Sequence, residues 1–260
     1  MRPIEPILVF LAALDFGCRS RPPAPETGTL GNKVEVNATT LNATGKQEAA
    51  WSGWSDVEAA ILDHSNQPVA VQRTLLARAF DFCLEQRDFL RARFVNEQLY
   101  PGKSSEDRAN RAYNEGVIAK NQQRFLETEQ AWLQAMNLAP QNQQYRKSLG
   151  MLYANFGHFL KALPLLKELP KDPQVELTLA VVERQLGLGD SADTRCYKLI
   201  DQTPTDPLVL YNCSLMEIEN HHNPAKALQW LEIAKEHLPQ GSPLGEKINQ
   251  QIASLHELKN

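Results

Sequence analysis

Two kinds of residue recur along the second half of the chain at a nearly constant interval. A small residue occupies four positions, spaced by 34, 30 and 34 residues: Gly116, Gly150, Ala180 and Ser214. A proline follows each of them, with spacings of 30, 34 and 35 residues: Pro140, Pro170, Pro204 and Pro239. Such an interval indicates a chain built from stacked copies of one small unit, because a single copy cannot bury its own apolar face.

Within each interval the apolar residues have the spacing of two helices joined by a turn. In 109–142 the two helices carry Tyr113, Gly116, Val117, Trp132, Ala135 and Leu138. The pattern of 143–172 is clearest, with Leu149, Gly150, Tyr153, Gly157 and Ala162. The second helix of this repeat is short, by about one helical turn, so its apolar face stays in phase.

These residues resemble the tetratricopeptide repeat (TPR), a helix–turn–helix unit of about 34 residues. The resemblance covers roughly residues 70–241 and implies an all-α fold, a right-handed TPR superhelix. It places four repeats at 109–142, 143–172, 173–206 and 207–241. The loop 219–224 of the last repeat is one residue longer than the pattern. Residues 242–260 are expected to form the capping helix that ends a solenoid.

Residues 51–108 are interpreted as N-terminal helices that include a degenerate repeat at 70–102. Ser55 followed by Glu58 has the spacing of a capping box, which predicts a helix from about 55 to 64. Pro68 suits the first turn of the next helix. The segment 87–92 predicts a further helix that ends before Pro101.

The first 50 residues have the layout of an exported, lipid-anchored protein. Residues 1–17 resemble a bacterial lipoprotein signal peptide, since an apolar run over 7–14 stops just before Gly17-Cys18. The resemblance implies lipidation of Cys18, although Asp15 stands where that family usually has Leu. Residues 18–50 predict a disordered linker because they carry few large apolar side chains. The resemblance to such lipoproteins also implies the outer membrane, facing the periplasm, as the location, because Arg19 and not Asp follows the cysteine. The alternatives are a poorly ordered N-terminus with a free thiol at Cys18, in a periplasmic or secreted protein, and a signal anchor.

No pattern of catalytic residues is present, so the chain is expected not to be an enzyme and to use no cofactor. A net charge of −4 gives no basic surface for nucleic acid. His221 and His222 are adjacent in a predicted turn, where their rings diverge, so no metal site is expected. Cys196 and Cys213 fall on neighbouring helices; two buried thiols are favoured over a disulfide. Cys83 is expected in the core.

The resemblance implies that the first helices of the repeats line a concave groove that binds a protein or peptide partner. The family's groove positions correspond here to Tyr113, Asn114, Val117, Lys120, Lys147, Met151, Asn155, Arg184, Tyr211 and Asn212, together with Leu177, Val181, Leu215 and Ile218. The partner site is expected to centre on Tyr113, Asn114, Lys147, Met151 and Asn155, and replacing Tyr113 and Asn114 by alanine is expected to abolish binding and leave melting nearly unchanged. Because Tyr113 and Val117 occupy the first pair of clamp positions, the pattern argues against the family's carboxylate clamp. For Val117, Val181 and Leu215, packing of the solenoid is an equal alternative.

The expected function is a membrane-tethered, non-enzymatic scaffold that assists assembly of a cell-envelope complex. A docking subunit of a cell-wall enzyme and a soluble secreted interaction protein are the alternatives.

Overall fold

A computed structural model describes residues 51–219, 221–239 and 241–257 of the 260-residue chain. The predicted signal peptide, Cys18 and the linker lie outside the described residues. The described part contains twelve helices and no strand. Their bounds are α1 Trp54–Asp63, α2 Val69–Glu85, α3 Phe89–Leu99, α4 Ser105–Asn121, α5 Phe125–Leu138, α6 Gln143–Asn155, α7 Phe159–Lys167, α8 Pro173–Gln185, α9 Gly189–Gln202, α10 Pro207–Glu219, α11 Pro224–Glu236 and α12 Pro243–Glu257.

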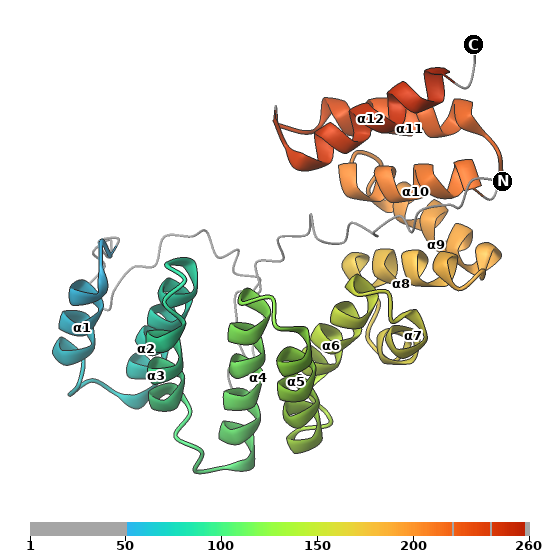
Figure 1. The fold of residues 1–260 in the computed structure, drawn as a ribbon. Helices are drawn as coiled ribbons and strands as arrows, with labels where there is room; N and C mark the ends of the chain where they lie inside the picture. Colours follow the sequence, from blue (N-terminus) through green and yellow to red (C-terminus); the bar gives the residue numbers. More distant parts are fainter. Residues whose placement is uncertain (1–50, 220, 240, 258–260) are drawn as a thin grey trace, which may run out of the picture. The chain divides into compact units, whose positions relative to one another are not determined.

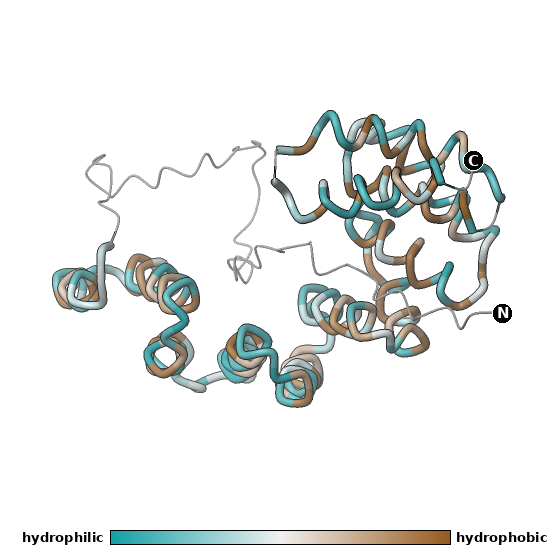
Figure 2. Tube along the Cα trace, turned by 45° about the horizontal axis from the view of Figure 1, so that its top comes forward, coloured by the Kyte–Doolittle hydropathy of each residue, from teal (hydrophilic) through white to brown (hydrophobic). Residues whose placement is uncertain are grey.

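The helices form antiparallel pairs within two compact units, which are described separately. One unit holds α1 to α5, with α2 against α3 and α4 against α5 (Figure 1). The other holds α6 to α12, with the pairs α6–α7, α8–α9 and α10–α11, and α12 packs on α11. The division falls after Pro140, inside the predicted array of repeats. Figure 2 shows hydrophobic and hydrophilic residues alternating around the helices, as expected of helices that bury one face.

A residue with positive φ lies in the turn between the two helices of every pair, at the same place in each pair. These residues are Arg87, Gln123, Gly157, Gly187 and His222. In four of the turns the next N–H donates to a carbonyl five residues back, as from Asp88 to Cys83 at 2.8 Å. In the last turn Asn223 donates to Glu217, six residues back, at 3.0 Å. The extra residue predicted for the loop 219–224 is therefore present, and the turn absorbs it.

The first helix begins differently from the prediction. The proposed capping box is wrong: α1 begins at Trp54, so Ser55 lies inside it, and no side chain caps Gly53. Instead, the N–H and Oγ of Ser52 both donate to the Asp56 carboxylate at 2.7 Å, and these bonds lower the pKa of Asp56. Pro68 is the N-cap of α2 and not its first residue. The expectation failed because the carboxylate that bonds back across the start of α1 is Asp56, which accepts from Ser52, and because the N-cap residue, Gly53, has no capping side chain.

The small residue in each first helix sits where the second helix of the pair crosses it. A Cβ added to Gly116 would overlap the indole ring of Trp132, which is 2% exposed. At Gly150 the same Cβ would lie 2.8 Å from a terminal methyl of Leu166, on the nine-residue α7. Ala180 and Ser214, at the equivalent positions, are fully buried. The recurring small residue is thus explained by close approach of the two helices.

We expect Gly116→Ala to lower stability by about 1–3 kcal/mol, because the indole of Trp132 cannot move aside in a packed core. Alanine in a helix interior would otherwise gain about 1 kcal/mol over glycine. Gly150→Ala is the matched control, since a leucine methyl can rotate away, and it should change stability much less. Thermal or denaturant unfolding of the two variants gives the comparison. Equal stabilities would mean that the contact with Trp132 does not constrain position 116.

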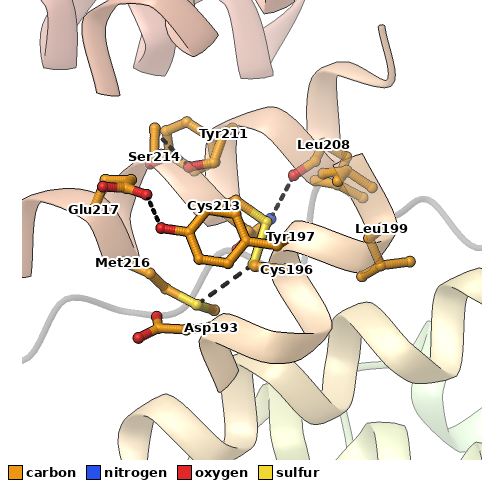
Figure 3. The surroundings of a disulfide bond; sticks show 12 residues. Asp193, Cys196, Tyr197, Leu199, Leu208, Tyr211, Cys213, Ser214, Met216 and Glu217 are labelled. Atoms are coloured by element: carbon orange, nitrogen blue, oxygen red, sulfur yellow. Dashed lines mark hydrogen bonds between the residues drawn. A yellow bond between two sulfur atoms is a disulfide. The ribbon is translucent and has the colours of Figure 1, made fainter. Parts of the chain in front are cut away.

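A disulfide joins two consecutive pairs. Cys196 of α9 and Cys213 of α10 are bonded, with their Cα atoms 5.6 Å apart, so the preference for two free thiols is wrong (Figure 3). Both cysteines are buried among Leu177, Leu199 and Val209. The Sγ of Cys196 also lies 3.4 Å from the Met216 sulfur; since a disulfide has no proton to donate, this is a van der Waals contact. Cys83 is a buried free thiol, as predicted, and burial raises its pKa to about 11.

Reduction of this disulfide should lower the melting temperature. The bond closes a loop of 17 residues in sequence, which in the chain-entropy account corresponds to about 3 kcal/mol. Melting with and without dithiothreitol measures the effect. The double variant Cys196→Ala/Cys213→Ala is the control. Its melting temperature should lie near that of the reduced wild-type protein and should not change when dithiothreitol is added. A wild-type melting temperature that reductant does not change, with reduction verified by thiol counting, would contradict the expectation.

Candidate functional site

The predicted partner-binding residues lie on first helices, as expected, but in two units. Tyr113, Asn114, Val117 and Lys120 are on α4, in the α1–α5 unit. The others are on α6, α8 and α10 of the second unit, where α6 contacts α8 and α8 contacts α10. Five of the ten are buried: Tyr113, Asn114, Val117, Arg184 and Asn212. Five are half-buried: Lys120, Lys147, Met151, Asn155 and Tyr211.

Tyr113 and Asn114, two of the five residues at the centre of the predicted site, make contacts inside their own unit. The Tyr113 ring stacks on Trp132 with centroids 5.8 Å apart, and its carbonyl accepts the indole N–H at 3.0 Å. The side-chain amide of Asn114 donates to Oδ1 of Asn96, on α3, at 3.0 Å. Their replacement by alanine would therefore remove core contacts, and the expectation that they have no role in stability is wrong. A role in binding stays a prediction for both.

The apolar members of the predicted groove pack the solenoid. Val117 is 2% exposed, Val181 is fully buried and Leu215 is 8% exposed. Leu177, at 4%, belongs to the cluster around the disulfide. Asn212 donates its amide to the Leu208 carbonyl of its own helix at 2.9 Å. Among the predicted groove residues of the second unit, the half-buried ones are therefore Lys147, Met151 and Asn155 on α6, and Tyr211 and Ile218 on α10.

Lys147 of α6 is tied to the start of α8. Its Nζ lies 2.5 Å from the Asp172 carboxylate, which also caps α8 by accepting the N–H groups of Gln174 and Val175. Burial by itself would raise the pKa of Asp172, but these hydrogen bonds outweigh it and hold the pKa below its usual value. Lys147 is thus a link between consecutive repeats, while Met151 and Asn155 further along α6 remain half-buried.

Arg184, near the end of α8, is the one charged side chain among the described residues of this unit whose buried nitrogens lack a hydrogen bond. Its side chain is 4% exposed, and its Nε lies 3.6 Å from the Glu219 carboxylate of α10. Within the residues that the structure describes, its Nε and Nη1 have no hydrogen-bond partner. Burial lowers the pKa of Arg184, with Glu219 acting in the opposite direction. Burial likewise raises the pKa of the half-buried Tyr211, against the effect of Arg184. We refer to Lys147, Met151, Asn155, Arg184 and Tyr211 as the first-helix face.

Sequence reasoning missed two buried ionic groups, both of which tie helix pairs together. Glu183 of α8 is fully buried and accepts from Arg195 of α9 at 2.8 Å, while Arg195 also reaches Glu176. Glu217 of α10, shown in Figure 3, accepts from the Tyr197 hydroxyl and lies 2.8 Å from Lys226 of α11. Neither group has a helical spacing that would have revealed it, because each joins residues from different helices.

The histidine pair belongs to a turn. His222 supplies the left-handed residue of the α10–α11 turn, with φ of 50°, and its Nδ1 lies 3.2 Å from the Ile218 carbonyl oxygen. His221 Nε2 lies 2.9 Å from the Asp193 carboxylate. In the part of the chain that the structure describes, no group of three metal-binding side chains occurs. No helix of that same part is long and apolar enough to cross a bilayer.

The chain resembles solved structures of TPR proteins. No protein-family model matches the sequence, and no curated protein is similar enough to align. A structure described as YrrB, "a TPR protein with an unusual peptide-binding site", is 18% identical with a TM-score of 0.53, over 75% of this chain and 97% of that one. MamA 41-end from Desulfovibrio magneticus RS-1 is 12% identical with a TM-score of 0.50, over 72% and 94%. A MamA RS-1 double mutant is 11% identical with the same score, over 72% and 96%.

At these identities the likeness concerns the fold. The chain has an all-α, helix–turn–helix solenoid fold of the kind seen in TPR proteins.

Proposed function

We propose that the chain is a non-enzymatic scaffold that binds a peptide segment of a protein partner on the first-helix face. The observation that carries the proposal is the combination of side chains on contacting first helices. Met151 and Tyr211 are half-buried apolar groups, and Asn155 and Arg184 hold polar atoms without hydrogen-bond partners among the described residues. A flexible thioether and an aromatic ring give adaptable contact area, while amide and guanidinium groups fix a peptide's orientation. The TPR fold, with a peptide-binding protein among the similar structures, supports the proposal.

Peptide selection on the purified full-length chain tests this function. A random peptide library displayed on phage should yield binders. The double variant Met151→Ala/Tyr211→Ala should bind a selected peptide at least tenfold more weakly than the wild type, because truncating anchor residues commonly costs about 2 kcal/mol. Leu160→Ala is the matched control, since Leu160 lies on the second helix α7 and is 79% exposed. Its affinity should equal that of the wild type. Selected peptides that bind both variants equally would contradict the proposal.

We further propose that the scaffold is exported and held at the outer membrane by a lipid on Cys18, where it assists assembly of an envelope complex. The apolar run before Gly17-Cys18 supports export. The disulfide between Cys196 and Cys213 supports it independently, because such bonds persist in oxidising compartments and are rare in the cytosol. A docking subunit of a cell-wall enzyme and a secreted, unlipidated protein remain the alternative functions.

We expect mass spectrometry of the mature protein to find an acylated Cys18 at the N-terminus. Cys18→Ser should move the protein from the membrane fraction to the soluble fraction, because serine at this position cannot carry the acyl groups that are proposed to hold the protein in the membrane. Cys83→Ser is the matched control, since Cys83 is a buried thiol in α2, and it should leave the distribution unchanged. An intact Met1, or an unmodified cysteine at a processed N-terminus, would contradict lipidation.

A further inference from the structure

The Arg184 guanidinium is buried without the hydrogen bonds that such a group normally makes. Arg184 is 8% exposed, and two of its three guanidinium nitrogens, Nε and Nη1, are buried with no hydrogen-bond partner among the described residues. In that part of the chain it is the one charged side chain with such atoms. The other buried ions among the described residues have partners: Asp107 has Arg73, Glu183 has Arg195, and Glu217 has Tyr197 and Lys226. Because burying a polar group without a partner is costly, the exception calls for an explanation.

Glu219 neutralises Arg184 without binding it. Its carboxylate lies 3.6 Å from Nε, beyond hydrogen-bond distance, and the Glu219 side chain is 41% exposed at the last residue of α10. The attraction lowers the cost of the buried charge, yet Nε and Nη1 of the guanidinium make no hydrogen bond with any described residue. A second carboxylate could take them by displacing a side chain that is already close to solvent. Bonds between a guanidinium and a carboxylate are charge-assisted, and roughly twice as strong as neutral ones.

A second unpartnered atom lies on the neighbouring first helix. The Oδ1 of Asn155 is buried and accepts no hydrogen bond from any described residue. Asn155 is the last residue of α6, and Arg184 is the last but one of α8, two helices in contact. The end of one helix thus offers an acceptor, and the end of the next offers donors. An extended peptide carries the groups that would satisfy both, since a backbone N–H can donate to an amide oxygen and an acidic side chain can accept from a guanidinium.

We propose that Arg184 and Asn155 form a subsite for an acidic residue, Asp or Glu, within an extended segment of a protein partner. The inference rests on the proposed function, since it gives the chemistry of the segment that the scaffold binds. Arg184 receives the carboxylate, and Asn155 receives a backbone N–H of the same segment. Glu219 holds the charge of Arg184 while the subsite is empty.

Peptide binding by the full-length chain tests the subsite. Peptides are selected from a library whose C-termini are fused to the phage coat, so that only side-chain carboxylates are offered. The selected sequences should share an acidic residue, and a C-terminally amidated synthetic copy provides the probe. Exchanging that residue for its amide should weaken binding to the wild type at least tenfold. With Arg184→Met the same exchange should change affinity less than twofold.

Two controls separate binding from stability. Arg146→Met removes the same charge from α6, where Arg146 is paired with Glu168 at 3.4 Å, and should keep the full preference for the acid. Arg184→Met should melt at or above the wild-type temperature, since it removes donors that the fold leaves unsatisfied. A lower melting temperature for Arg184→Met than for Arg146→Met would overturn the inference by assigning Arg184 to the core.

The outcomes distinguish this inference from the function on which it rests. Binders without a shared acidic residue, or an equal effect of the acid-to-amide exchange in wild type and Arg184→Met, overturn the subsite and leave the scaffold in place. Selection of no peptide at all overturns both. A preference confined to free C-terminal carboxylates, found by repeating the measurement with unamidated peptides, also overturns the assignment to an internal acidic residue.

Discussion

The close approach of two helices within a pair is the constraint on which this solenoid depends. Gly116 admits the indole of Trp132, and Trp132 in turn stacks on Tyr113 and donates to its carbonyl. One missing Cβ therefore lets a large side chain fill the space between α4 and α5. A pair packed in this way still exposes apolar residues at its sides, so it requires a neighbouring pair or a terminal helix. In the second unit α12 has that role, burying Ile248 and Leu255 against α10 and α11.

The sequence predicted those features of the fold that depend on one helix or one turn. Gly116 and Gly150 marked the crossing points, and the shortened second helix of 143–172 corresponds to the nine-residue α7. The extra residue predicted in the last turn is also present, since the N–H of Asn223 donates to the Glu217 carbonyl six residues back and not five. Helical periodicity determines which face a residue occupies but not how deeply it is covered. For that reason Tyr113 and Asn114 were assigned to a binding surface, although Trp132 and Asn96 cover them.

Features that join different helices could not be predicted, because they require distances that a single sequence does not contain. The sequence placed Cys196 and Cys213 on neighbouring helices but did not give their separation. In the structure their Cα atoms are 5.6 Å apart and the two cysteines form a disulfide. Arg184 was assigned to the groove by its position in the repeat. Its lack of hydrogen bonds, and the nearby Glu219, appear only once α8 and α10 are in place. The part of the candidate site that carries chemistry thus came from the structure.

The disulfide also decides how the chain responds to force. Cys196 and Cys213 bracket the turn between α9 and α10, so a pull applied through the two ends of the chain passes across the sulfur–sulfur bond. The segment between them is shielded, and the fully stretched chain is shorter by about 50 Å, at roughly 3.3–3.6 Å per residue. A protein that links two partners would therefore keep the junction of its last repeats closed under load, and would extend first where no covalent bond spans the pairs.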